Sequence, residues 1–241
     1  MSKKQKLIVV AGPPASGKTS VMIHTIKSIL RHQQKVAVAK IDCLETDDDE
    51  RYTNLGVPVV VGLSNDICPD HYFVVNLEEI ENWSAEFESD ILIIETAGLC
   101  HRCAPGLDKG LSVCVIDCLS SIKVPQKIGP VATTADLIII TKGDSISQAE
   151  REVFRIKVRQ LNPKAVIVES NGITGGGSEQ IGKLFMESPF DEKIEGARLR
   201  HSMPTAICSY CMGETRVGNR FQQGVVHKMD FKRQWRPEHV Q

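Results

Sequence analysis

The sequence lacks the features that mark several large classes of protein. Its 29 Lys and Arg balance 30 Asp and Glu, giving a formal net charge of −1, so the charge predicts no nucleic-acid or membrane partner. No apolar run approaches the roughly 18 residues that cross a bilayer. The apolar stretch from Leu7 to Ala11 is too short for the core of a signal peptide. Together these absences predict a cytoplasmic protein.

Cysteine, by contrast, is abundant: the chain has eight. In a reducing compartment that number favours metal or redox chemistry over structural disulfides. The 241 residues suit one α/β domain with an appendage, or one domain of generous size, and internal repeats are absent. A hydrophobic content of 41% with 24% charged residues is that of an ordinary soluble globule.

Residues 12–19 read Gly-Pro-Pro-Ala-Ser-Gly-Lys-Thr, which fits the phosphate-binding pattern G-x-x-x-x-G-K-[ST]. An apolar run predicts a strand over Lys6–Ala11, and apolar residues at helical spacing continue to His32. Backbone N–H groups of the loop would wrap a polyphosphate, Lys18 would reach the β- and γ-phosphates, and Thr19 would bind Mg²⁺. The predicted nucleotide-contacting residues are Gly12, Pro13, Pro14, Ala15, Ser16, Gly17, Lys18, Thr19 and Ser20.

Further along the chain, apolar runs alternate with amphipathic segments. Strands are predicted over 35–41, 57–63, 90–95, 111–118, 136–141 and 164–169, and helices over 70–87, 146–160 and 178–186. Because nearly every strand is apolar throughout, we expect a Rossmann-like, mostly parallel sheet with helices on both faces, an α/β P-loop fold. The pattern changes near Pro189, which predicts a P-loop domain over 1–189 and a C-terminal extension over 190–241. Short strands are predicted in that extension between Thr215 and Met229.

Polar residues follow several of these strands. These residues are Asp42, Glu95, Lys142 and Asn171. Parallel sheets bind their ligands at the carboxyl ends of the strands. Glu95 has a Walker-B type of position, from which it would hold Mg²⁺ or orient the attacking water. Gly98 would present its N–H to a γ-phosphate. The plainer alternative for Glu95 is a carboxylate that merely ends a strand.

Thr141-Lys142-Gly143-Asp144 resembles the guanine-reading motif N-K-x-D, with Thr in place of Asn. Asp144 would accept two N–H bonds from guanine, and Lys142 would lie along the base. A site built to pair those donors rejects adenine, which lacks them. The motif therefore predicts GTP and GDP as ligands.

In this order the motifs resemble the CobW/HypB/UreG family of P-loop GTPases, over roughly residues 6–186. The acidic segment 42–51 is similar to switch I of hydrogenase-type members, and the runs beginning at Asn162 and Asn171 are similar to two further family signatures. The resemblance implies slow GTP hydrolysis coupled to homodimerisation, with a client metalloenzyme or other maturation proteins as partners. It implies catalytic roles for Lys18, Glu95 and Asp42, Mg²⁺ ligands among Thr19, Asp42, Asp47 and Glu95, and nucleotide contacts from Asn171 and Gly172.

The resemblance also implies transition-metal ligands between the switches. Cys68-Pro69-Asp70-His71 and Cys100-His101-Arg102-Cys103 stand where members of the family carry such ligands. Thiolate and imidazole suit Ni²⁺, Zn²⁺ or Co²⁺, and two facing copies would complete a ligand set. The alternative is that Cys68 and Cys100 are small buried hydrophobes. Cys114 and Cys118, on one face of an apolar strand, are predicted to pack in the core.

A second C-x-x-C pair, Cys208 and Cys211, lies outside the resemblance. It has the form of half a zinc knuckle, and a full site needs four ligands. Cys100 with Cys103, a nearby histidine or a second chain could supply the rest, so zinc or an iron–sulfur cluster is predicted here. A redox dithiol and simple packing remain the alternatives.

These predictions together favour a GTP-hydrolysing metallochaperone or maturation factor that delivers nickel or another transition metal. Two other functions stay open. An ATP-dependent small-molecule kinase would share the P-loop, although the arginines form no evident lid. A nucleotide-dependent zinc or iron–sulfur sensor would use the cysteines.

Overall fold

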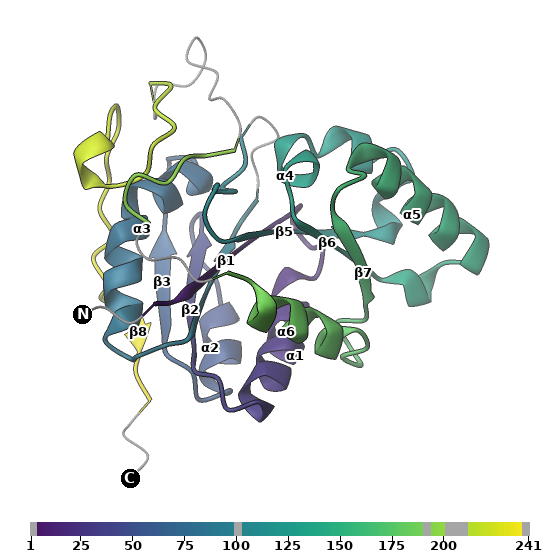
Figure 1. The fold of residues 1–241 in the computed structure, drawn as a ribbon, viewed down its shortest axis with the longest axis horizontal. Helices are drawn as coiled ribbons and strands as arrows, with labels where there is room; N and C mark the ends of the chain where they lie inside the picture. Colours follow the sequence, from purple (N-terminus) through teal and green to yellow (C-terminus); the bar gives the residue numbers. More distant parts are fainter. Residues whose placement is uncertain (1–3, 99–102, 190–193, 201–211, 238–241) are drawn as a thin grey trace.

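A computed structural model describes residues 4–98, 103–189, 194–200 and 212–237 (Figure 1). The candidate ligands Cys100, His101, Cys208 and Cys211 lie outside the described residues.

One sheet runs through the described part of the chain, in the order β7-β6-β5-β1-β4-β2-β3-β8. Every neighbouring pair is parallel except β8, which pairs antiparallel with β3. The predicted parallel sheet of an α/β P-loop fold is confirmed. The strands are β1 Lys6–Ala11, β2 Val36–Asp42, β3 Val59–Leu63, β4 Ile91–Thr96, β5 Leu111–Asp117, β6 Leu137–Thr141, β7 Val166–Ser170 and β8 Gln234–Trp235.

Helices cover both faces of this sheet. They are α1 Lys18–Arg31, α2 Asp48–Thr53, α3 Pro69–Ala85, α4 Pro130–Thr133, α5 Gln148–Leu161 and α6 Ser178–Glu187, with 3₁₀ turns η1 Cys118–Ser120, η2 Pro125–Lys127, η3 Gly143–Ser145 and η4 Asn219–Phe221. Side chains alternate along β1, so Ile8 and Val10 pack with α1, α2 and α6, whereas Leu7 and Val9 pack with α3. The other end of the α3 face is covered by α4 and α5. Since helices cover both faces of the sheet, side chains on both faces of its central strands are buried, which is why those strands are almost continuously apolar in the sequence.

Helix α2 was not predicted, because its segment is acidic and turn-rich. Of its six residues only Tyr52 is buried, so no amphipathic period marks it in the sequence. Acidic residues fill its first turn, where the positive end of the helix dipole stabilises them. This short helix brings the acidic segment up to the P-loop.

The C-terminal extension differs from its prediction. No regular strand forms between Thr215 and Met229, where the described backbone makes an isolated bridge at Arg216 and the turn η4. The strand lies later, at β8, and extends the main sheet beside β3 (Figure 1). Buried residues of the extension join the core cluster of α3: Ile194, Ala197, Leu199, Val217 and Met229. The division into 1–189 and 190–241 stays a prediction.

Among the described residues, no helix has both the length and the apolarity needed to cross a membrane.

Candidate nucleotide site

The loop between β1 and α1 is shaped by two glycines. Gly12 has φ of 150°, and a Cβ there would lie 2.1 Å from the carbonyl oxygen of Val115. Gly17, at the N-cap of α1, is left-handed with φ of 89°. Only glycine adopts these conformations at no steric cost. The sequence motif thus dictates a tight loop that ends on a helix N-terminus, where backbone N–H groups bind anions.

Lys18 folds back over this loop. Its ammonium donates to the carbonyls of Gly12 and Pro13, each at 3.0 Å. Burial lowers the pKa of Lys18, and Glu95 opposes that shift. Gly98 closes the loop from the side of β4, because a Cβ at Gly98 would lie 2.2 Å from the oxygen of Gly12. This close approach of Gly98 to Gly12 is open only to glycine, and the contact of the Gly98 N–H with a γ-phosphate stays a prediction.

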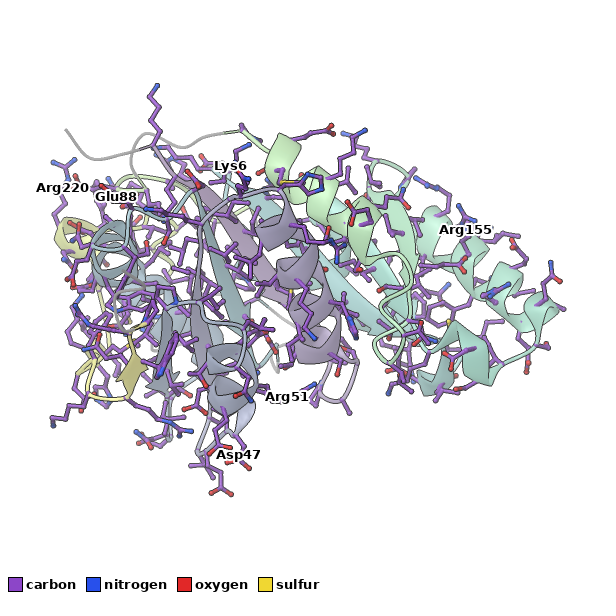
Figure 2. The ribbon with its side chains drawn as sticks, turned by 90° about the horizontal axis from the view of Figure 1, so that it is seen from below. Lys6, Asp47, Arg51, Glu88, Arg155 and Arg220 are labelled. Atoms are coloured by element: carbon purple, nitrogen blue, oxygen red, sulfur yellow. The ribbon has the colours of Figure 1, made fainter. Side chains whose placement is uncertain are left out.

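A cavity of about 420 Å³ opens over the loop at the carboxyl ends of the strands. Most of the predicted phosphate and Mg²⁺ residues meet here, together with several that were not predicted. Arg51 of α2 reaches α1, where its guanidinium donates to the Ser20 hydroxyl at 3.0 Å (Figure 2). The lining residues are Pro14, Ala15, Gly17, Lys18, Thr19, Ser20, Lys40, Asp42, Cys43, Asp48, Arg51, Glu95 and Ala97.

Glu95 is the centre of a buried network below this cavity. Its side chain is wholly buried, and its Oε1 lies 2.7 Å from the Thr19 hydroxyl and 2.8 Å from the Lys40 ammonium. Its Oε2 accepts a hydrogen bond from the Tyr52 hydroxyl. Burial and the neighbouring Glu95 raise the pKa of Tyr52, so the phenol stays protonated and donates. Glu95 is thus fixed from α1, α2 and β2 at once.

Asp48 is the acidic residue of the predicted switch segment that reaches Thr19. Its Oδ2 lies 2.8 Å from the Thr19 hydroxyl, whereas Asp47 is exposed at the N-cap of α2 and projects outward (Figure 2). Asp42 lines the cavity, with its Oδ2 3.5 Å from the Lys40 ammonium. Asp47 was predicted as a Mg²⁺ ligand, but the helix turns the neighbouring Asp48 toward Thr19 and leaves Asp47 exposed.

Sequence reasoning missed Lys40, Asp48, Arg51 and Tyr52. Lys40 did carry a signal, because it is a charged residue inside the apolar run that became β2, where every residue from Val36 to Ile41 is buried. A lysine inside a buried strand needs a buried partner. Tyr52 and Asp48 carried no comparable signal, since each depends on a helix that the sequence pattern does not indicate.

The oxygen ligands at Thr19 fit Mg²⁺. A hydroxyl and carboxylates are the hard donors that this ion prefers, and it commonly takes one or two carboxylates and completes its shell with phosphate oxygens and water. The described residues include no group of three or more His, Cys, Asp or Glu placed to hold a metal alone. Thr19 and the carboxylates of Asp48 and Glu95 would hold the ion, which would neutralise phosphate charge.

The T-K-x-D motif is joined to the P-loop by two hydrogen bonds. The Thr141 hydroxyl donates to the carbonyl of Ser16, and the Lys142 ammonium to that of Ala15, both at 2.6 Å. A second cavity of about 220 Å³ adjoins this motif, and Asp144 stands on it with its side chain exposed. The lining residues are Ile140, Gly143, Asp144, Arg151, Glu169, Ser170, Asn171 and Gly176.

Asn171 and Gly172 shape the loop on the far side of that cavity. The Asn171 Oδ1 accepts from the backbone N–H groups of Ile173 and Thr174, at 2.8 and 2.9 Å. A Cβ at Gly172 would lie 3.0 Å from the Cβ of Ser20, so this loop packs closely on α1. Asn171 thus acts on the loop conformation as well as lining the cavity.

The described cysteines are not gathered into one group. Cys68 is the half-buried N-cap of α3, and Cys103 is buried in the core cluster of that helix. The His71 Nε2 donates to the carbonyl of Val225 at 2.6 Å, and burial lowers the pKa of His71. Cys114 and Cys118 are buried under α4 and α5, which confirms their predicted core packing.

Residues 6–169 match the family model for the CobW/HypB/UreG nucleotide-binding domain. The chain belongs to this family. An uncharacterized protein of Methanocaldococcus jannaschii is 52% identical over 225 residues, which cover 93% of this chain and 96% of that protein.

Two solved structures show the same fold as this CobW/HypB/UreG member. The hydrogenase maturation factor HypB of Archaeoglobus fulgidus has a TM-score of 0.60 at 23% identity, covering 75% of this chain and 88% of its own. HypB of Helicobacter pylori, solved in complex with nickel, has a TM-score of 0.61 at 19% identity, covering 77% and 87%. The family model ends at residue 169, so the C-terminal extension lies beyond it.

Proposed function

We propose that this protein binds GTP with Mg²⁺ and hydrolyses it. One observation carries the proposal: the T-K-x-D segment is bonded to the P-loop at Ala15 and Ser16. The segment beside the second cavity is thus bonded to the loop under the first, which supports one nucleoside triphosphate with its phosphates in the first cavity and its base near Asp144. Lys18 neutralises phosphate charge in the transition state, and Glu95 helps to hold the Mg²⁺ that shares this role.

Nucleotide preference tests this part of the proposal. We expect GTP to bind more tightly than ATP, since Asp144 accepts from two guanine donors that adenine lacks. Asp144→Asn replaces one acceptor by a donor, so it should weaken GTP by about 10- to 100-fold and favour xanthosine triphosphate. Titration with fluorescent nucleotides measures both. Tighter ATP binding by the unaltered protein would favour a small-molecule kinase instead.

We further propose that GTP controls the delivery of nickel or another transition metal to a client enzyme. Family membership supports this, and so does Cys68 at the start of α3, a helix that contacts β2, the strand that α2 contacts from the other face of the sheet. Nucleotide would bring two copies together, so that thiolates from both chains complete one metal site. The other candidate ligands are His71, Cys100, His101, Cys103, Cys208 and Cys211.

Metal titration with and without a non-hydrolysable GTP analogue tests this second part. If nucleotide controls metal binding, about one Ni²⁺ should bind per two chains with the analogue, and Ni²⁺ should bind far more weakly without it. Sedimentation measures the dimer in the same samples. Cys68→Ala should lower the metal stoichiometry and leave GTP affinity unchanged. If Ni²⁺ binds tightly with or without nucleotide, and equally tightly to the Cys68→Ala variant, the site is a static structural one, as in a sensor.

A further inference from the structure

Lys40 is a buried cation in the middle of the Mg²⁺ ligands. Its side chain is 4% exposed, and its ammonium lies 2.8 Å from Glu95 Oε1, 2.9 Å from Asp48 Oδ2 and 3.5 Å from Asp42 Oδ2. Carboxylate oxygens this close to an ammonium favour its protonated form. The residue is therefore charged, and it partly neutralises three carboxylates.

The fold dictates this position. Parallel pairing of β2 with β4 sets Lys40 directly opposite Glu95 in register. Both side chains point to the face covered by α1 and α2, as their neighbours Val38 and Ile93 do. Lys40 cannot leave Glu95 without a break in the strand pairing or a change of its own rotamer.

Lys40 and Thr19 contact the same two oxygen atoms. Glu95 Oε1 and Asp48 Oδ2 each lie within 2.9 Å of the Lys40 ammonium and within 2.8 Å of the Thr19 hydroxyl. A Mg²⁺ ion on the Thr19 hydroxyl would need these oxygens at about 2.1 Å. Two cations would then compete for the same lone pairs and repel each other in a buried site.

A triphosphate changes this balance. It brings negative charge and oxygen ligands into the cavity, so the ion can draw part of its shell from phosphate. The ammonium can then turn toward a phosphate oxygen or toward Asp42. The cavity can hold both cations once the nucleotide is present.

We propose that Lys40 is an internal competitor of the divalent cation, so that the cation binds at Thr19 with nucleotide and not before it. This rests on the proposed function of the site, because Mg²⁺ with GTP is the ligand that overcomes the competition. Lys40 acts through Glu95 and Asp48, which makes it a positioning residue.

Mn²⁺ is the probe, because free and bound Mn²⁺ are counted directly by electron paramagnetic resonance. In nucleotide-free protein we expect Lys40→Met to bind Mn²⁺ at least tenfold more tightly than the unaltered chain. Lys40→Arg, which keeps the charge, should behave like the unaltered chain. Adding Asp48→Asn to Lys40→Met should abolish the gain, which locates the ion at this site.

Thermal unfolding supplies a second measurement. Removing the ammonium leaves Glu95 and Asp48 as uncompensated neighbours, so Lys40→Met should have a lower Tm that Mn²⁺ restores without nucleotide. If that variant does not fold, Lys40→Gln keeps a hydrogen-bond donor and serves in its place. Equal Mn²⁺ affinity in the unaltered and neutral variants would overturn the proposal. Failure of the unaltered protein to bind GTP would instead overturn the proposed function, because the Mn²⁺ comparison uses no nucleotide.

Discussion

At the scale of single residues, the site depends on how each oxygen of Glu95 is occupied. Oε1 faces Thr19 and Lys40, and Oε2 accepts from Tyr52. A buried carboxylate is tolerated only with such partners, since an unsatisfied one costs a large desolvation free energy. The carboxyl end of β4, where Glu95 meets the proposed nucleotide cavity, is therefore also part of the hydrogen-bonded interior.

Tyr52→Phe tests how much that bonding contributes. The substitution keeps the buried ring and removes the hydroxyl that donates to Glu95 Oε2. We expect it to lower the free energy of unfolding by about 1–3 kcal/mol, because a hydrogen bond to a buried charged group is lost. Urea unfolding measures the change. Thr53→Ala, at the next position of α2, is the matched control and should change stability by less than about 0.5 kcal/mol. Equal effects of the two variants would show that the Tyr52 hydroxyl is not stabilising.

At the scale of elements, α2 is held by the C-terminal extension as well as by the P-loop. The Arg233 guanidinium donates to both carboxylate oxygens of Asp49, at 2.7 and 2.8 Å, and to the carbonyl of Thr46. Just beyond Arg233, β8 pairs with β3. The extension thus clamps the helix that carries Asp48 and Tyr52.

Arg233→Ala removes this clamp without touching the nucleotide cavity. A partly exposed ion pair contributes up to about 1 kcal/mol, so amide exchange over 46–53 should accelerate by up to about fivefold. Hydrogen exchange followed by mass spectrometry measures it. Arg236→Ala is the control, because Arg236 pairs with Glu86 and lies over the ring of Phe87 instead. Unchanged exchange in α2 after Arg233→Ala would mean that the pair does not restrain the helix.

At the scale of the whole molecule, the extension and the P-loop domain share one core cluster. Met229 is buried against α3, and its backbone N–H donates to the Asn76 Oδ1 at 2.8 Å. Val217 is buried in the same cluster. Shared burial of this kind couples the unfolding of two segments.

Met229→Ala should therefore destabilise the complete chain. We expect a loss of about 2–5 kcal/mol in a single unfolding transition, as for other large-to-small changes in a core. Met212→Ala is the control, since Met212 is 57% exposed. Two separate transitions, with Met229→Ala moving just one of them, would show instead that residues 190–241 unfold by themselves.

The local parts of this protein could be predicted from the sequence. Residues 12–19 specify their own loop, because glycine conformation, a helix N-terminus and a lysine side chain act within a few residues of one another. The alternation of apolar strands with amphipathic helices likewise predicted the parallel sheet. Thr141 to Asp144 carries its motif within four residues.

The rest was decided by tertiary structure. Lys40 and Glu95 are 55 residues apart and meet because β2 pairs with β4 in one register, which no local pattern specifies. Asp48 rather than Asp47 faces Thr19 because α2 forms, and α2 forms around the burial of Tyr52 against the sheet. A phosphate loop is encoded by neighbours in sequence, whereas the charges that surround its metal ion come from strands and helices brought together by packing.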